Sequence, residues 1–93
     1  MKRALVRSPS FMRAAKRYIK KNPTAAEAIR TTLNLLAEDV FDPRLRTHKL
    51  KGSLGDCWAA SAGYDLRIVF EFVSHSGSEA ILLLSIGTHD EVY

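Results

Sequence analysis

The sequence predicts an α+β fold: an N-terminal strand, a helical hairpin, then a three-stranded antiparallel meander. Apolar residues recur at helical spacing in residues 9–39 and alternate with polar ones in residues 64–73. A Ser- and Gly-containing stretch at 74–78 then leads into the apolar run 80–86, as a loop joins two strands of a hairpin. We expect the helices to cover one face of the sheet and the other face to remain exposed.

The chain begins with a short strand and a basic helix. Residues 3–7 alternate apolar and basic side chains, as a strand does. Ser8 is a favoured N-cap residue, and Pro9 suits the first helical position because its missing N–H has no partner there. The helix has an apolar face, and its other positions are largely cationic. We expect its core face to contain Phe11, Ala15, Tyr18 and Ile19.

A second helix is expected after Asn22-Pro23, which interrupts the first. Thr24 and Glu27 have the spacing of a capping box, in which each side chain satisfies a backbone N–H of the first turn. The helical pattern continues to about Asp39. Its buried side is expected to contain Ala25, Ile29, Leu33 and Leu36.

The second half of the chain predicts the sheet. Residues 41–50 follow no regular pattern, and Pro43 ends any helix. Strands are expected at residues 57–61, 64–73 and 80–86, the last of them inside the sheet because it is apolar on both faces. Alternation in the second strand places Asp65 and Arg67 together, on the face turned away from the helices.

Length and composition limit the classes of protein. With 93 residues the chain is expected to form one domain, residues 1–93, without a separate cofactor domain. Its single cysteine, Cys57, excludes an internal disulfide, and residues 1–8 lack the apolar stretch of a signal peptide. The longest apolar run, residues 80–84, is far shorter than the roughly 20 residues that span a bilayer. We therefore expect a cytoplasmic protein with no membrane association.

Charge is distributed unevenly along the chain. Residues 1–50 contain twelve Lys or Arg against four acidic residues, a balance of +8, whereas residues 51–93 contain two against six, a balance of −4. Such asymmetry indicates a polyanion or an acidic partner bound by the first half, or else a solvated basic helix face. Candidates for contact with RNA on the first helix are Arg13, Arg17 and Lys20.

The second half contains a plausible set of residues for RNA cleavage. Cutting RNA without a metal requires a base for the ribose 2′-OH, a cation for the charged phosphate and an acid for the leaving 5′-oxygen. His exchanges protons near neutral pH, Arg binds phosphate in a bidentate manner, and Tyr stacks on bases. The candidates are His48, Asp65, Arg67, His89 and Tyr93.

Simpler readings of these residues remain open. Asp65 and Arg67 could form a surface ion pair that contributes little to stability, and His48 could be a solvated turn residue. The three histidines and one cysteine have no metal-ligand spacing, so we expect no metal site and no other cofactor.

Three segments resemble one protein family. Residues 48–52 (HKLKG), 63–70 (GYDLRIVF) and 86–93 (IGTHDEVY) are similar to toxins of the RelE/ParE superfamily, most of all to its YafQ-like branch. The similarity covers essentially the whole chain, in the same order of elements. It implies the RelE-like microbial RNase fold and the toxin half of a type II toxin–antitoxin pair. Many members of that superfamily cut mRNA in the ribosomal A site.

The resemblance also implies roles for single residues. His48, Asp65 and His89 match the YafQ-like catalytic set, Tyr93 its terminal aromatic residue, and Arg67 a catalytic arginine of RelE. Lys49 and Lys51, next to His48, would hold phosphate. At Ser61, however, the YafQ-like pattern has a further catalytic histidine.

These correspondences give a mechanism and a set of partners. His89 would be the general acid, Asp65 or His48 the base, and Arg67 the group that stabilises the pentacovalent phosphate, while Tyr93 would stack on a base of the codon. The implied partners are the ribosome, mRNA and a cognate antitoxin with an acidic, partly disordered binding segment. The alternatives are a ParE-type poison of DNA gyrase and a non-catalytic RNA- or protein-binding module.

Overall fold

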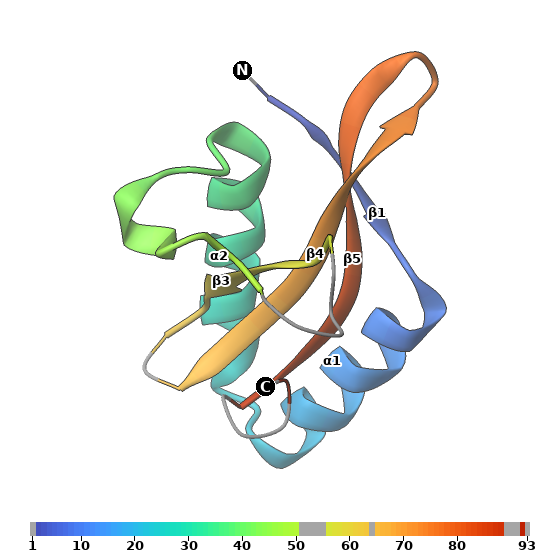
Figure 1. Cartoon of the computed structure of the whole chain (residues 1–93). Helices are drawn as coiled ribbons and strands as arrows, with labels where there is room; N and C mark the ends of the chain where they lie inside the picture. Colours follow the sequence, from blue (N-terminus) through green and yellow to red (C-terminus); the bar gives the residue numbers. More distant parts are fainter. Residues whose placement is uncertain (1, 51–55, 64, 89–91, 93) are drawn as a thin grey trace.

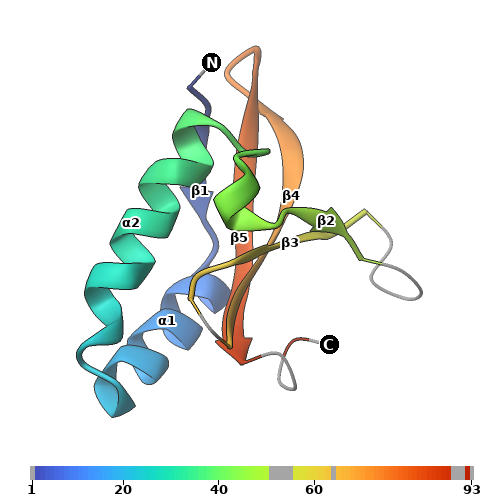
Figure 2. The ribbon, with the colours of Figure 1, turned by 90° about the vertical axis from the view of Figure 1, so that its left-hand side faces the viewer.

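The structure, a computed structural model, describes residues 2–50, 56–63, 65–88 and 92. The elements follow the chain in the order β1 (Ala4–Arg7), α1 (Pro9–Lys21), α2 (Ala25–Glu38), the 3₁₀ turn η1 (Pro43–Leu45), β2 (His48–Lys49), β3 (Trp58–Ser61), β4 (Leu66–His75) and β5 (Ser78–Thr88). The strands form one sheet in the order β1-β5-β4-β3-β2. β1 runs parallel to β5, and the other pairs are antiparallel. Both helices lie on the same side of the sheet (Figures 1 and 2), which confirms the predicted α+β class with its helical hairpin and the β3–β5 meander.

The first helix begins as its sequence predicts. The Ser8 hydroxyl accepts a hydrogen bond from the Phe11 backbone N–H at 3.1 Å, and Pro9 is the first helical residue. Lys20 and Lys21 end the helix, where cations interact favourably with the helix dipole. Its predicted core face is also confirmed, because Phe11 is buried and the partly buried Ala15, Tyr18 and Ile19 pack against the core.

The second helix begins where expected, but the predicted capping box is wrong. Thr24 already has helical backbone angles, φ −69° and ψ −16°, and its side chain makes no capping hydrogen bond. An N-cap side chain reaches the first turn from an extended backbone, which Thr24 lacks. The connection satisfies two N–H groups instead: Ala25 N–H donates to the Asn22 carbonyl at 2.9 Å, and Ala26 N–H to the Pro23 carbonyl at 3.3 Å.

The segment 41–50, expected to be irregular, contains two short elements. η1 is capped by Asp42, whose carboxylate accepts the Arg44 backbone N–H at 2.9 Å. β2 is a two-residue strand that pairs with β3 at the edge of the sheet. Two residues cannot show alternation, so the sequence offered no sign of this strand.

The β4–β5 hairpin is longer than predicted. Its strands reach His75 and Ser78, so the loop is reduced to Ser76 and Gly77, with φ of 52° and 79°. Two consecutive positive φ angles are characteristic of a type I′ turn, the connection that matches the twist of paired strands. β5 lies between β1 and β4, inside the sheet as expected.

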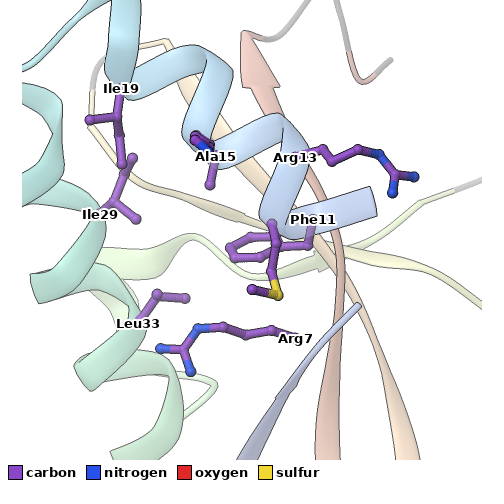
Figure 3. A pocket seen from close by; sticks show the side chains of 9 residues that line it. Arg7, Phe11, Arg13, Ala15, Ile19, Ile29 and Leu33 are labelled. Carbon is purple, nitrogen blue, oxygen red and sulfur yellow. The ribbon is translucent and has the colours of Figure 1, made fainter. Parts of the chain in front are cut away.

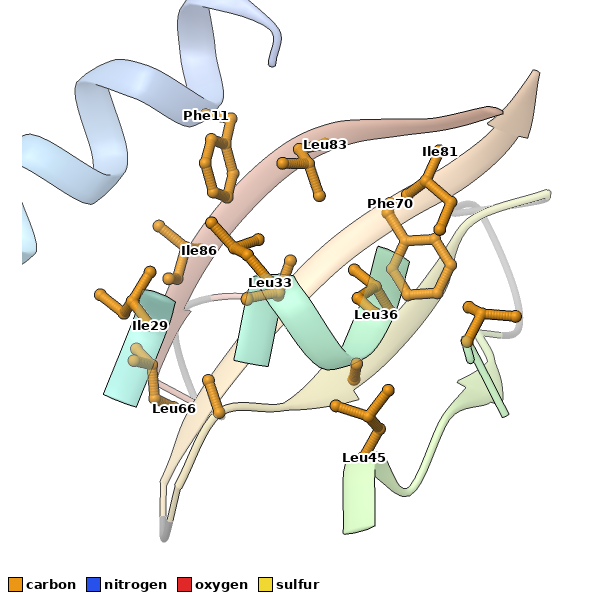
Figure 4. Packing of buried hydrophobic residues seen from close by; sticks show 14 of the residues in the cluster. Phe11, Ile29, Leu33, Leu36, Leu45, Leu66, Phe70, Ile81, Leu83 and Ile86 are labelled. Atoms are coloured by element: carbon orange, nitrogen blue, oxygen red, sulfur yellow. The ribbon is translucent and has the colours of Figure 1, made fainter. Parts of the chain in front are cut away.

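The main core fills the space between the helices and the sheet (Figure 4). Even-numbered residues of β4, among them Leu66, Ile68 and Phe70, point into it, which confirms the predicted alternation for the described part of that strand. Leu33 and Leu36 of α2 pack against them. Full burial of such a side chain contributes about 1.5–3 kcal/mol to the stability of the fold. These apolar contacts therefore determine which face of the sheet the helices cover.

The opposite face of the sheet is only partly exposed, which corrects the expectation of an open surface. A second, smaller apolar cluster lies there, built from Leu50, Ala59 and Val69 with Cys57, Leu84 and Val92 packed against it. Ala59, Val69 and Leu84 belong to β3, β4 and β5. The other three members come from segments that flank the strands, which the sequence did not place on this face: Leu50, Cys57 and Val92. The polar part of this face is therefore confined to the area outside that apolar cluster.

Candidate functional site

A cationic pocket lies at the end of β3 and the beginning of β4. It has a volume of about 380 Å³ and is lined by Arg44, Arg46, Ser61, Gly63 and Arg67. The arginines come from two segments, the η1 region and β4, that are separated by β2 and β3 in the chain. Three guanidinium groups around one hollow create a strongly positive site.

In the η1 region, two of these arginines flank the buried side chain of Leu45. Leu45 is 1% exposed and belongs to the main core, while its neighbours Arg44 and Arg46 are exposed. The Asp42 carboxylate accepts from Arg44 Nε at 3.0 Å and from Arg44 Nη2 at 2.8 Å. These hydrogen bonds lower the pKa of Asp42 from 3.8 to about 2. Arg44 is thus fixed in orientation at the rim of the pocket.

The β3–β4 turn presents the third arginine. Gly63 has φ +124°, a backbone conformation that side chains disfavour, and the Ala62 N–H donates to the Leu66 carbonyl at 2.8 Å across the turn. Ser61 and Arg67 are cross-strand partners on β3 and β4. Arg67 is partly buried, and its Nη1 donates to the Leu66 carbonyl at 3.1 Å. The turn therefore determines where the guanidinium lies.

His48 lies on the same sheet face as Arg67. The register pairs His48 with Ala59, and Ala59 with Val69. Arg67 lies two residues from Val69 on β4, and such residues share a face about 7 Å apart along the strand. His48 and Arg67 therefore occupy neighbouring rows of the sheet surface.

The orientation of the His48 ring is set by the η1 region. Its Nδ1 lies 3.0 Å from the Arg46 carbonyl oxygen. A carbonyl only accepts hydrogen bonds, so Nδ1 carries the proton in this contact and Nε2 is the basic nitrogen of the neutral ring. Arg46 thus contributes its side chain to the pocket and its carbonyl to the histidine.

The structure does not bring all predicted residues to this pocket. Asp65 is exposed, one residue before β4, and is not part of the pocket lining. Lys49 pairs with Trp58, so it points to the opposite face from His48. The α1 candidates are exposed on a helix that covers the other side of the sheet (Figure 2). They are Arg13, Arg17 and Lys20.

Three further candidates lie outside the described residues: Lys51, His89 and Tyr93.

Sequence reasoning missed Arg44 and Arg46. A usable signal was present, because Asp42 followed by Pro43 has the pattern of a capped helical turn. In such a turn a single apolar residue, Leu45, between two arginines would be expected to bury itself and to leave both arginines outside.

The geometry supports particular chemistry. Guanidinium groups bind phosphate oxygens through their N–H donors, so the arginines of this pocket can hold a phosphodiester and stabilise added charge on it. Arg44 contributes less than the others, because its Nε and Nη2 already donate to the Asp42 carboxylate. His48 is not part of the pocket lining and lies two strands from Arg67, so its imidazole can exchange a proton only with a substrate that extends from the pocket along this sheet face. Within the described residues, no three His, Cys, Asp or Glu side chains group as metal ligands, and no helix is long and apolar enough to cross a membrane.

Comparisons with solved structures agree with this fold. The toxin YafQ from E. coli strain BL21(DE3) superposes with a TM-score of 0.78 and 15% identity over 98% of each chain. The E. coli DinJ–YafQ toxin–antitoxin complex gives a TM-score of 0.76 and 16% identity, covering 100% of this chain and 99% of that one. A metal-bound toxin from Helicobacter pylori gives 0.76 and 23% over 100% of both chains.

Sequence comparison identifies the family. No curated protein matches this chain significantly. The family model described as the bacterial toxin of type II toxin–antitoxin systems, YafQ, matches residues 3–93, nearly the whole sequence. The chain belongs to the YafQ family of type II toxin–antitoxin toxins.

Proposed function

We propose that this chain is a ribosome-dependent mRNA endonuclease that inhibits translation and that a cognate antitoxin neutralises. The observation that carries the proposal is the arginine pocket of Arg44, Arg46 and Arg67 with His48 in the neighbouring row of the same sheet face. The YafQ family match over residues 3–93 supports it. Action on the ribosome would place the protein in the cytoplasm.

The proposed reaction is an attack of the ribose 2′-OH on the adjacent phosphorus, without a metal. A base removes the 2′-OH proton, the new O–P bond forms, and the bond to the 5′-oxygen breaks as that oxygen receives a proton. The products are a 2′,3′-cyclic phosphate and a free 5′-OH. The arginines would stabilise the pentacovalent phosphate, in which negative charge is greatest.

The proton-transfer roles follow from the residues available. His48 is the better-supported base, because its Nδ1 contact with the Arg46 carbonyl makes Nε2 the proton acceptor. Asp65 remains the alternative base. His89 is proposed as the general acid and Tyr93 as a stacking platform for a base of the codon.

The residue at position 61 distinguishes this chain from the YafQ-like pattern. Ser61 cannot exchange a proton near pH 7 as a histidine would, and its cross-strand partner is Arg67. We infer that Arg67 supplies charge stabilisation at the place where relatives have a second imidazole. Catalysis would then depend more on electrostatics and less on proton transfer.

The test is to induce the chain briefly in a bacterial host and to map new mRNA 5′ ends. Two reporters are compared, one translated and one without its start codon. We expect ends at a fixed position within codons of the translated reporter only. Growth arrest without new ends would contradict the nuclease and would direct attention to gyrase, which a DNA-break assay examines.

A variant of the pocket provides the matched comparison. Arg67→Ala should reduce the rate at which new ends appear by roughly 10²- to 10³-fold, the usual cost of losing one group that stabilises the transition state. Arg30→Ala is the control, because Arg30 is an exposed arginine on α2, outside the pocket lining. Equal rates for both variants would remove Arg67 from the mechanism.

The proposed partner is an antitoxin encoded beside the toxin. Solved complexes of similar folds include DinJ–YafQ from E. coli and YoeB–YefM from Staphylococcus aureus. A toxin that arrests its own host requires such a protein. Co-expression of the neighbouring gene should restore growth, and the two proteins should co-elute at micromolar concentration.

A further inference from the structure

One arginine of the arginine pocket is bound to a carboxylate. Asp42 Oδ1 accepts a hydrogen bond from Arg44 Nε at 3.0 Å, and Asp42 Oδ2 accepts one from Arg44 Nη2 at 2.8 Å. Arg44 lines the pocket, whereas Asp42 does not. Only 16% of the Asp42 side chain is exposed, against 72% for Arg44. The carboxylate is therefore held next to the pocket without occupying it.

The cations of a second pocket have no such partner. This pocket, of about 440 Å³, lies between α1 and α2, and Figure 3 shows Arg7 and Arg13 among its lining residues, together with apolar side chains such as Phe11 and Ile29. Within the part of the chain that the structure describes, no Asp or Glu forms an ion pair with Arg7 or Arg13. A bound carboxylate is thus a feature of the arginine pocket and not of every cationic surface in this protein.

The fold needs the oxygen of Asp42 but not its charge. Asp42 Oδ1 also accepts the Arg44 backbone N–H at 2.9 Å and so caps the η1 turn. Asn and Ser are about as favourable as Asp at such a capping position. An exposed ion pair usually contributes little to stability. The negative charge of Asp42 therefore has its main effect on the pocket.

That charge is present near neutral pH and acts on whatever the pocket binds. The hydrogen bonds from Arg44 hold the pKa of Asp42 at about 2, so its carboxylate is ionised at pH 7. Because the carboxylate contacts a guanidinium of the pocket, it lies within the roughly 8–10 Å over which charges interact at physiological salt. It therefore lowers the positive potential that the three arginines create.

A lower potential matters most for the most highly charged ligand. A phosphodiester in an RNA chain carries one negative charge, whereas a phosphate group bound through a single oxygen carries nearly two at neutral pH. Attraction to the pocket increases with the charge of the ligand, and so does the cost of removing the ligand from water. When the potential is reduced, the dianion loses more attraction than the monoanion and still has the larger dehydration cost.

We propose that Asp42 determines the specificity of the arginine pocket, making it selective for singly charged phosphodiesters over doubly charged free or terminal phosphates. Three guanidinium groups without a counter-charge would hold the dianion best, and free phosphate would then compete with RNA. This inference rests on the proposed function in one respect, since it takes the RNA backbone as the natural ligand. It adds the residue that distinguishes this backbone from other phosphates.

The test measures how the whole chain binds two small phosphates at pH 8, where methyl phosphate is a dianion and dimethyl phosphate a monoanion. The variants are Asp42→Asn and Asp42→Ser, which both keep a capping oxygen and remove the charge. Each should raise the affinity for methyl phosphate about two- to fivefold, the range expected for one exposed charge contact, and the affinity for dimethyl phosphate by a smaller factor. NMR titrations of the backbone amides of Ser61 and Gly63, two uncharged residues of the pocket lining, follow the binding.

A charge-matched control excludes an effect of net charge. Glu27→Gln removes one negative charge on α2, outside the arginine pocket, and should leave both affinities unchanged. Circular dichroism melts establish that each variant is folded, and agreement between Asp42→Asn and Asp42→Ser assigns the effect to the charge. Equal gains for the two ligands, or no gain for either, would overturn the role of Asp42.

The outcomes also separate this inference from the nuclease proposal, because binding of small phosphates requires neither ribosome nor cleavage. A shift of selectivity in a chain that produces no new mRNA ends would support the role of Asp42 and contradict the nuclease. Unshifted selectivity in a chain that cleaves the translated reporter would contradict the role of Asp42 and support the nuclease.

Discussion

At the scale of single residues, Arg46 links the two halves of the candidate site. Its left-handed backbone, φ 50°, ends the η1 turn and directs the chain into β2, where its carbonyl meets His48 Nδ1. Its side chain lines the arginine pocket. A non-glycine residue in this conformation is uncommon, and the buried side chain of Leu45 before it helps hold the turn. The η1 turn therefore positions His48 together with Arg44 and Arg46, whereas the β3–β4 turn positions Arg67.

Cys57 offers a prediction about pH at the residue scale. The pKa of its thiol is raised mainly by burial, and the negative charges of Glu71 and Asp56 raise it further. Less thiolate is then present at a given pH, so alkylation by iodoacetamide should be slower than for a free cysteine and should reach its maximum at a higher pH. Mass spectrometry of the adduct at several pH values measures this.

Glu71→Gln should shift the same profile toward lower pH, because it removes one of the charges that disfavour the thiolate. Glu27→Gln is the control, since Glu27 is exposed on α2 and does not contribute to the shift. A profile that Glu71→Gln leaves unmoved would show that the charge of Glu71 does not affect the Cys57 thiol, leaving burial and Asp56 as the causes of its raised pKa.

At the scale of elements, the β4–β5 turn predicts two opposite changes in stability. Asn adopts positive φ more readily than Ser, so Ser76→Asn should raise the free energy of unfolding by a few tenths of a kcal/mol up to about 1 kcal/mol. Gly77→Ala should lower it by about 1 kcal/mol. A Cβ at Gly77 would meet nothing within 4 Å, so that loss would reflect backbone conformation alone. Urea denaturation midpoints measure both, and equal midpoints would contradict the turn geometry.

Local signals in the sequence predicted most of the elements. The Ser8 cap, the helix break at Pro23 and the alternation of β4 each depend on neighbouring residues, and each is confirmed. The Thr24 cap failed because its backbone conformation is set by the turn before it. The two-residue strand β2 exists only through pairing with β3, a contact that periodicity along one segment cannot show.

The candidate site was predictable in residue type but not in arrangement. Arg67 and His48 were identified, and the sheet register places them on one face. Arg44 and Arg46 were missed, since their role depends on the packing of η1 against the sheet. Lys49 was expected beside His48, but adjacent residues of a strand point to opposite faces. Two residues that are adjacent in a strand are therefore not expected to belong to the same site.

At the scale of the whole molecule, the sheet separates two cationic surfaces. The arginine pocket lies on one side, and α1 covers the other with exposed cations that include Arg17 and Lys20 (Figure 2). A group on the far side of a sheet cannot touch a phosphate bound in the arginine pocket. Under the proposed function, the α1 cations would therefore contribute to binding and not to the cleavage step.

This separation predicts that variants of the two surfaces affect different quantities, ribosome binding in one case and the rate of cleavage in the other. The double variant Arg17→Ala, Lys20→Ala should weaken binding to programmed ribosomes and should reduce the salt dependence of log K by roughly one unit per cation removed, as expected for contacts with phosphates. Cleavage of bound mRNA under single-turnover conditions should keep its rate, whereas Arg67→Ala should lower that rate. Arg30→Ala, an exposed cation of α2, should change neither quantity. A loss of single-turnover rate in the α1 variant with unchanged binding would mean that α1 cations reach the reacting phosphate, and would contradict the separation of the two surfaces by the sheet.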